Sequence, residues 1–173
     1  FLSVIGKTAG FVLILRIIVM LYEGAPGDTY GALSFMEKNS GYIAFIAAVT
    51  MIAGNLIALM QKDIKRLLAC SSIAHAGYLL VSLTTHDYFT ASTVWFYLTA
   101  YLFMTLGAFA VVQFMTDKSD SSDMDVFAGL HKKSPLLAVM LALFLLSMAG
   151  IPGTAGFIAK LHIFLGAFAA SPS

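Results

Sequence analysis

Five stretches of the chain are apolar and long enough to cross a bilayer, and short polar clusters separate them. A hydrocarbon core about 30 Å thick needs roughly 20 apolar residues of helix. This pattern predicts an all-α fold, a polytopic transmembrane helix bundle with about five membrane segments. In chain order the predicted segments are residues 2–22, 42–60, 67–83, 89–115 and 136–170.

The last segment is too long for one straight helix. As unbroken helix, residues 136–170 would measure about 52 Å at 1.5 Å per residue. Pro152, near the midpoint, removes an intrahelical hydrogen bond, while Gly150 and Gly153 permit non-helical backbone. We therefore expect a discontinuous helix that is broken at Gly150–Gly153. A helical hairpin is the alternative, and it would leave two short spans joined by an uncharged turn.

The composition agrees with a membrane protein. Hydrophobic residues make up 60% of the chain and charged residues 11%, whereas soluble domains carry about 25% charged residues. The formal net charge of +1 argues against an electrostatic nucleic-acid binder. A single cysteine, Cys70, excludes disulfide frameworks and cysteine-rich metal sites within the chain. The start at Phe1, within an apolar run, predicts that the chain is a fragment of a longer protein.

The basic residues of the connections predict the orientation of the bundle. The connections 61–66 and 116–134 hold six of them, and the connections 22–41 and 84–88 hold only Lys38. By the positive-inside rule, 61–66 and 116–134 are cytoplasmic loops. The six residues are Lys62, Lys65, Arg66, Lys118, Lys132 and Lys133.

The connection 116–134 also holds four aspartates, which invite comparison with a calcium loop. A loop that started at Asp117 would have Ser122 where an EF-hand needs its sixth-position glycine. We therefore expect a solvated connector and no metal site here. Ser134 and Pro135 are predicted as the N-cap and first residue of the helix that follows.

Ionisable residues inside the predicted spans are the candidates for chemistry. A lysine or arginine there costs about 2.5–3.5 kcal/mol and usually faces a bundle interior or an ion pathway. Lys160 lies deep in an apolar run, where burial disfavours its charged form and a nearby anion restores it. It is either a proton-relay element or a lysine tied permanently to a carboxylate or to free carbonyls of the broken helix. All nine acidic residues lie in or at the edge of connections.

The other ionisable residues of the spans are unequal candidates. His75 follows Ser71 and Ser72 on an otherwise apolar helix, and is either a relay group or a hydrogen-bonded structural histidine. Lys7, between small residues, is a second lysine candidate for the relay. Arg16 we interpret as structural, because arginine does not readily deprotonate. His162 is the weaker histidine, since it lies two residues beyond Lys160 and on nearly the opposite helical face.

Two stretches resemble the antiporter-like membrane subunits of respiratory complex I. They are GNLIALMQKDIKRLLACSSIAHAGY at 54–78 and LLSMAGIPGTAGFIAK at 145–160, accompanied by FLSV at 1–4 and FAGL at 127–130. The resemblance implies that residues 1–173 are a single partial membrane domain, about helices eight to twelve of a larger subunit. It also implies that a glutamate and a lysine of earlier helices precede Phe1. Cys70 and Gly153 depart from the usual residues of the family.

The same resemblance implies a relay and a function. Lys7 matches a lysine that connects two half-channels, Lys160 matches the lysine of the broken twelfth helix, and His75 matches a frequent histidine of the tenth helix. The chain would translocate protons, while NADH oxidation and quinone reduction proceed in other subunits. It would hold no cofactor itself, and NADH, FMN, iron–sulfur clusters and quinone would be bound elsewhere in the complex.

The resemblance also implies the surroundings of the chain. Its partners would be neighbouring antiporter-like and small membrane subunits and the lipid bilayer, with no nucleic acid. A bacterial inner membrane is expected, with the mitochondrial inner membrane or the thylakoid as alternatives. Two other functions stay open. One is a subunit of a multisubunit Na⁺/H⁺ antiporter or membrane-bound hydrogenase, and the other is a structural scaffold whose buried lysines are locked.

Overall fold

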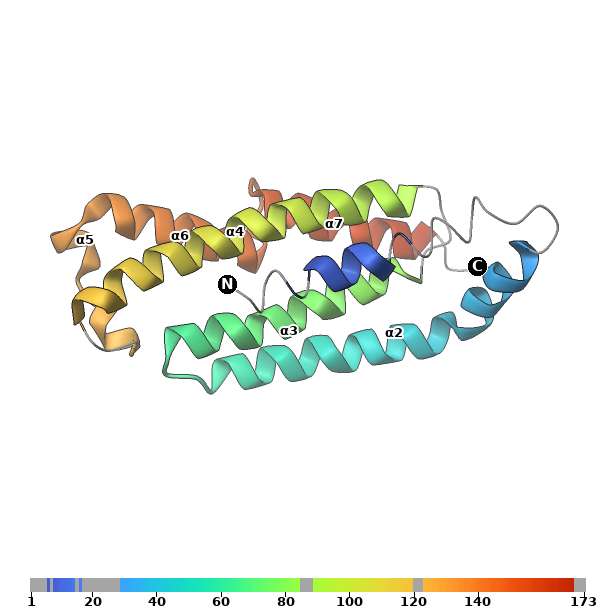
Figure 1. Cartoon of the computed structure of the whole chain (residues 1–173), viewed down its shortest axis with the longest axis horizontal. Coiled ribbons are helices and arrows are strands. Elements are labelled where there is room, and N and C mark those ends of the chain that lie inside the picture. The colour runs from blue at the N-terminus through green and yellow to red at the C-terminus, as the bar shows by residue number, and fades with distance from the viewer. Residues whose placement is uncertain are drawn as a thin grey trace.

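The structure, a computed structural model, describes residues 6, 8–14, 16, 29–84, 89–119 and 123–169, and these form an all-helical bundle (Figure 1). Residues 8–14 and 16 are helical. No strand occurs among the described residues beyond an isolated bridge between Asp63 and Asp123. The named elements are α2 (Thr29–Leu59), α3 (Ile64–Ser82), α4 (Phe89–Ser119), the short 3₁₀ helix η1 (Met124–Phe127), α5 (Leu130–Lys133), α6 (Pro135–Ala149) and α7 (Ala155–Ala169).

The helices pack as two layers that share a core. α2 packs along α3, and α4 packs along both α6 and α7, which follow one another along its length (Figure 1). α3 contacts α4 and α7 and so joins the layers. The largest fully buried side chains include Leu68 of α3, Tyr97 and Val112 of α4, and Ile163 of α7. The core therefore lies where α3, α4 and α7 meet.

Two helical segments of the described part are long and apolar enough to cross a membrane. They are Asn39–Leu59 within α2 and Ser92–Asp117 within α4, with mean hydropathies of 2.1 and 1.7. α6 and α7 are apolar but have only 15 residues each, about 22 Å of helix. Neither could cross about 30 Å of hydrocarbon alone.

Several predicted bounds were wrong. α2 begins at Thr29, so residues 29–41, predicted as connection, are helical. α4 continues to Ser119, and the predicted loop 116–134 also contains η1 and α5. No proline lies in 29–41 or 116–133, and polar residues other than proline do not prevent a helix from continuing. Polarity was therefore a poor guide to where these helices end.

The break in the last helix is built by its glycines. The backbone N–H groups of Gly150 and Ile151 both donate to the Leu146 carbonyl, and Gly150 has a φ of 88°. This is a helix end that favours glycine, because a side chain is strained in the left-handed region. Gly156 lets the second half approach the first: a Cβ there would lie 1.8 Å from the Ser147 carbonyl oxygen. The interruption thus lies between Ala149 and Ala155, around the predicted position.

The two basic connections meet at one end of the bundle. The Met124 N–H donates to the Lys62 carbonyl oxygen at 3.1 Å. Asp63 caps α3 by accepting from the backbone N–H groups of Lys65 and Arg66. Ser134 occupies the N-cap position of α6 as predicted, although its side chain makes no capping hydrogen bond.

Candidate functional site

Lys160 reaches from α7 to the end of α6. Its Nζ donates to the carbonyl oxygens of Met148 at 2.7 Å and Ala149 at 3.2 Å. The last carbonyls of a helix have no partner within the helix and carry the negative end of its dipole. A cation on these carbonyls is therefore stabilised. Lys160 is half-buried, and its ammonium group forms no ion pair with any carboxylate that the structure describes.

This geometry corresponds to one of the two interpretations that the sequence left open for Lys160, a lysine bound to free carbonyls of the broken helix. It does not exclude the other. Neutral carbonyls hold an ammonium group by hydrogen bonds alone, without the full charge of a carboxylate that would keep the proton in place. Within the described residues, Lys160 is thus held by carbonyls and is not paired with a carboxylate.

Tyr78 covers another side of the same ammonium group. Lys160 Nζ lies 4.7 Å from the centroid of the Tyr78 ring. This distance falls within the ≈ 6 Å range of a cation–π contact. The Tyr78 ring also meets the His75 ring edge to face, with centroids 5.9 Å apart and an interplanar angle of 75°. One aromatic ring therefore stands between two of the predicted relay residues, His75 and Lys160.

His75 is buried among tyrosines. Its Nδ1 lies 2.6 Å from the hydroxyl oxygen of Tyr97, a hydrogen bond between two side chains of the core. The Tyr101 ring lies 5.0 Å from the His75 ring, centroid to centroid. One ring nitrogen can therefore exchange a hydrogen bond with Tyr97 according to its tautomer. The hydrogen-bonded histidine and the relay histidine are both compatible with this contact.

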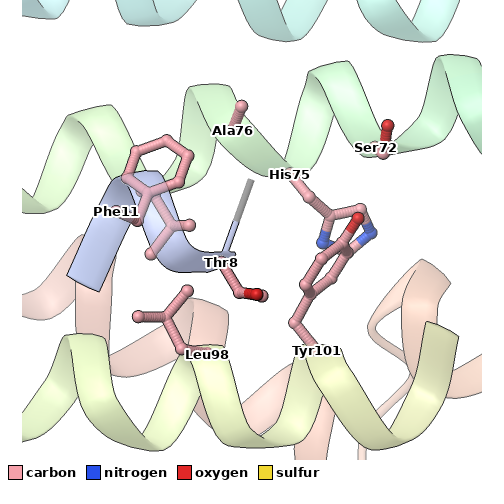
Figure 2. A pocket seen from close by; sticks show the side chains of 8 residues that line it. Thr8, Phe11, Ser72, His75, Ala76, Leu98 and Tyr101 are labelled. Atoms are coloured by element: carbon pink, nitrogen blue, oxygen red, sulfur yellow. The ribbon is translucent and has the colours of Figure 1, made fainter. Parts of the chain in front are cut away.

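A small cavity adjoins His75. Figure 2 shows Tyr101 of α4 rising toward His75 of α3, with Thr8 of the N-terminal helix to the left of both. The space open to the centre of a water molecule is about 10 Å³, which is about the room that one water needs. The Tyr101 hydroxyl is buried, and within the described part of the chain it has no hydrogen-bond partner. The lining residues are Thr8, Phe11, Ser72, His75, Ala76, Leu79, Leu98 and Tyr101.

The structure places the other predicted residues unevenly. Lys7 lies outside the described residues, and its neighbour Thr8 lines the cavity. Arg16 and His162 are exposed, and the His162 ring faces Phe96 with centroids 6.4 Å apart. His75 and Lys160 make no hydrogen bond to each other, and their link runs through Tyr78.

Sequence reasoning missed the tyrosines of the site. No part in the site was predicted for Tyr97 or Tyr101, and both are buried in the core. They lie four residues apart on α4, so one helix face carries both. Tyr78 lies three residues after His75, which is the signal that could have placed it beside the histidine. Tyr97 supplies a hydroxyl to His75, and Tyr78 supplies a ring face to Lys160. Neither contact was part of the predicted relay.

No group of three metal-ligating side chains is present in the ranges that the structure describes. Asp117 lies within α4 and accepts a hydrogen bond from Gln113 Nε2 at 2.7 Å. Asp120 lies outside the described residues. The aspartates of the predicted loop therefore do not converge in the described region.

A family model described as "NADH:quinone oxidoreductase/Mrp antiporter, TM" matches residues 1–173. The chain is 54% identical over 172 residues to "NADH-quinone oxidoreductase subunit N" of Geobacillus sp. (strain WCH70), covering 99% of this chain and 35% of that protein. It is 51% identical over 173 residues to the protein of the same name from Anoxybacillus flavithermus (strain DSM 21510 / WK1), covering 100% and 34%.

A more distant match extends the same pattern. "NADH-quinone oxidoreductase subunit N 2" of Chloroherpeton thalassium (strain ATCC 35110 / GB-78) is 40% identical over 173 residues, with coverage of 99% and 33%. The chain thus spans about a third of the length of the curated relatives it matches. All three of these relatives are named subunit N.

Proposed function

The chain belongs to the NADH:quinone oxidoreductase/Mrp antiporter transmembrane family, and we propose that it forms part of a proton-translocating membrane subunit of an NADH-quinone oxidoreductase. Quinone reduction in other subunits drives the transfer, and protons pass along Lys7, His75 and Lys160. The relatives at 54% and 51% identity, both named subunit N, support this assignment.

One observation carries the proposal: among the residues that the structure describes, carbonyls and not a carboxylate hold the Lys160 ammonium group. Its Nζ lies 2.7 Å from the Met148 carbonyl oxygen, at the break between α6 and α7. A half-buried ammonium group without a fixed counter-charge is one whose protonation can respond to a charge that moves nearby. The interrupted helix provides this site, because only a helix end offers free carbonyls within the membrane.

His75 gives the proposed relay a second group on α3. Its Nδ1 shares a hydrogen bond with the Tyr97 hydroxyl, and the two groups can reverse the direction of that bond as the tautomer changes. The adjoining cavity has room for about one water molecule next to Thr8. Lys7 precedes Thr8 in the chain, and we place it in the relay through the family resemblance.

The proposal includes the remainder of the complex. NADH, FMN, iron–sulfur clusters and quinone are assigned to other subunits, and none of them to this chain. The proposed partners are neighbouring antiporter-like and small membrane subunits. The proposed location is a bacterial inner membrane. The proposed topology has five membrane segments, and the last of them is broken. Residues 116–134 form its connection on the cytoplasmic side.

Two alternatives give different results in one experiment. The family model also covers the Mrp antiporters, so a Na⁺/H⁺ antiporter subunit is one alternative. The other is a scaffold in which this lysine only closes the helix break, and the hydrogen bonds from Lys160 to Met148 and Ala149 are compatible with it too.

The test replaces Lys160 with alanine in the full-length protein. After assembly of the complex has been confirmed, NADH-driven proton uptake into inverted membrane vesicles is measured alongside electron transfer. Lys132→Ala is the matched control, because Lys132 is an exposed lysine of α5. We expect K160A to lose most of the proton uptake and K132A to retain it. Normal uptake by an assembled K160A complex would support the scaffold, and sodium-dependent uptake would support the antiporter.

A further inference from the structure

Tyr78 touches two of the three residues to which the relay is assigned, Lys160 and His75. Its ring centroid lies 4.7 Å from Lys160 Nζ, and the ring meets that of His75 at a centroid distance of 5.9 Å. Neither the family resemblance nor the names of the relatives give Tyr78 a role. Its position at the contact of α3 with α7 is therefore a feature that needs a physical explanation.

The contact is built by the periodicity of both helices. His75 and Tyr78 are three residues apart on α3, and Lys160 and Phe164 are four apart on α7, so each pair shares a helix face. The Phe164 ring meets the Tyr78 ring at a centroid distance of 6.0 Å and an angle of 83°. The Tyr78 ring is thus held by aromatic neighbours from both helices and has little freedom to turn away from the lysine.

The ammonium group of Lys160 has three donors. The carbonyl oxygens of Met148 and Ala149 take hydrogen bonds at 2.7 and 3.2 Å. The Tyr78 ring, at 4.7 Å, is the additional neighbour that faces the charge. A ring attracts a cation through its electron-rich face, and more strongly where water is excluded. This attraction does not require the tyrosine hydroxyl.

We propose that Tyr78 is a positioning residue for Lys160, and that its ring face holds the ammonium group on the carbonyls at the helix break. The inference rests on the proposed function, since it assigns Tyr78 a part in the transport that Lys160 carries out. The Tyr78 ring fixes the position of the Lys160 ammonium group between proton transfers. In that position the ring contacts both the ammonium group and the His75 ring. It takes part in no proton transfer itself.

The test compares three variants of Tyr78 in the full-length protein within the assembled complex. Tyr78→Phe keeps the ring, Tyr78→Trp keeps an aromatic face, and Tyr78→Leu removes it. We expect NADH-driven proton uptake to remain near the wild-type rate in Y78F, and to fall on the order of threefold to tenfold in Y78L, because a half-buried cation–π contact is lost. Y78W should retain more uptake than Y78L. Tyr42→Leu, at an exposed tyrosine of α2, is the matched control.

A graded series of ring substitutions separates the effect of the electron-rich ring face from the effect of side-chain volume. Phenylalanines with one, three and five ring fluorines, incorporated at position 78, weaken the electron-rich face stepwise at similar size. We expect proton uptake to decline in the same order. Three results would overturn the inference. They are equal proton uptake across the fluorinated series, uptake as low in Y78F as in Y78L, and wild-type uptake in Y78L. K160A serves as the reference in each preparation. Normal proton uptake in K160A refutes the proposed function. Reduced uptake in K160A together with normal uptake in Y78L refutes only the role of Tyr78.

Discussion

Lys160 Nζ donates a 2.7 Å hydrogen bond to the carbonyl oxygen of Met148, and this bond crosses the break between two half-helices. The residue assigned to proton transfer therefore also closes the C-terminal end of α6. A cation at a helix C-terminus stabilises the unpaired carbonyls there. Changes to the backbone of the break should accordingly affect both the stability of the bundle and the position of Lys160.

Gly150→Ala should separate these two effects when it is compared with Gly129→Ala. Both glycines have positive φ, 88° and 76°, so each alanine costs about 1 kcal/mol or somewhat more of backbone strain. A Cβ at Gly150 would lie 3.3 Å from Lys160 Cδ and 3.4 Å from Nζ, whereas at Gly129 nothing lies within 4 Å. We expect both variants to lower the melting temperature of the purified full-length protein, and only G150A to reduce proton uptake. Equal uptake in the two variants would show that the break tolerates displacement of Lys160.

Gly156→Ala should be the most disruptive small change at the break. Its Cβ would lie 1.8 Å from the Ser147 carbonyl oxygen, so α6 and α7 would have to separate. Overpacking of this kind typically costs about 1–3 kcal/mol, and more where the obstacle is backbone. Gly41→Ala on α2, with nothing within 4 Å, should be neutral or stabilise by up to about 1 kcal/mol. Thermal unfolding of both full-length variants checks this, and a G156A protein as stable as wild type would contradict the close approach.

The sequence predicted the helical class and the place of the break because both follow from local physics. A proline between two glycines interrupts a helix wherever it stands, and the interruption lies between Ala149 and Ala155. Helix ends were less predictable. The polar residues at 29–41 predict a connection, yet α2 begins at Thr29, because packing decides whether such residues stay helical.

The candidate site was only partly predictable. Ionisable residues in apolar segments are conspicuous, so His75 and Lys160 could be singled out from the sequence. Their neighbours could not, because Tyr97 and Tyr101 come from another helix, and the contact of α3 with α4 is a matter of tertiary structure. The partner of Lys160 was also open, since a carboxylate and a free carbonyl are equally plausible from composition alone.

The contact between the two basic connections predicts that they lie on one side of the membrane. The Met124 N–H to Lys62 carbonyl bond joins them at 3.1 Å. In a full-length protein with Cys70 and any other cysteine replaced by serine, Lys62→Cys and Lys132→Cys should react with a membrane-impermeant maleimide from the cytoplasmic face, as the positive-inside rule requires. Thr84→Cys should react from the opposite face. Labelling of positions 62 and 132 from different faces would refute the predicted orientation.

A matched pair of substitutions on α4 tests the surroundings of His75. Tyr97→Phe removes the hydroxyl that lies 2.6 Å from His75 Nδ1 and leaves a buried nitrogen without its partner, which should cost about 1–3 kcal/mol. Tyr101→Phe removes a buried hydroxyl that has no hydrogen-bond partner in the described part of the chain, so it should be neutral or stabilise by about 1 kcal/mol. The chemical change is identical, and the two positions are one helical turn apart. Thermal unfolding of the two full-length variants gives the comparison, and a Y101F protein that loses as much stability as Y97F would mean that the Tyr101 hydroxyl is satisfied, for example by a water molecule in the cavity beside it.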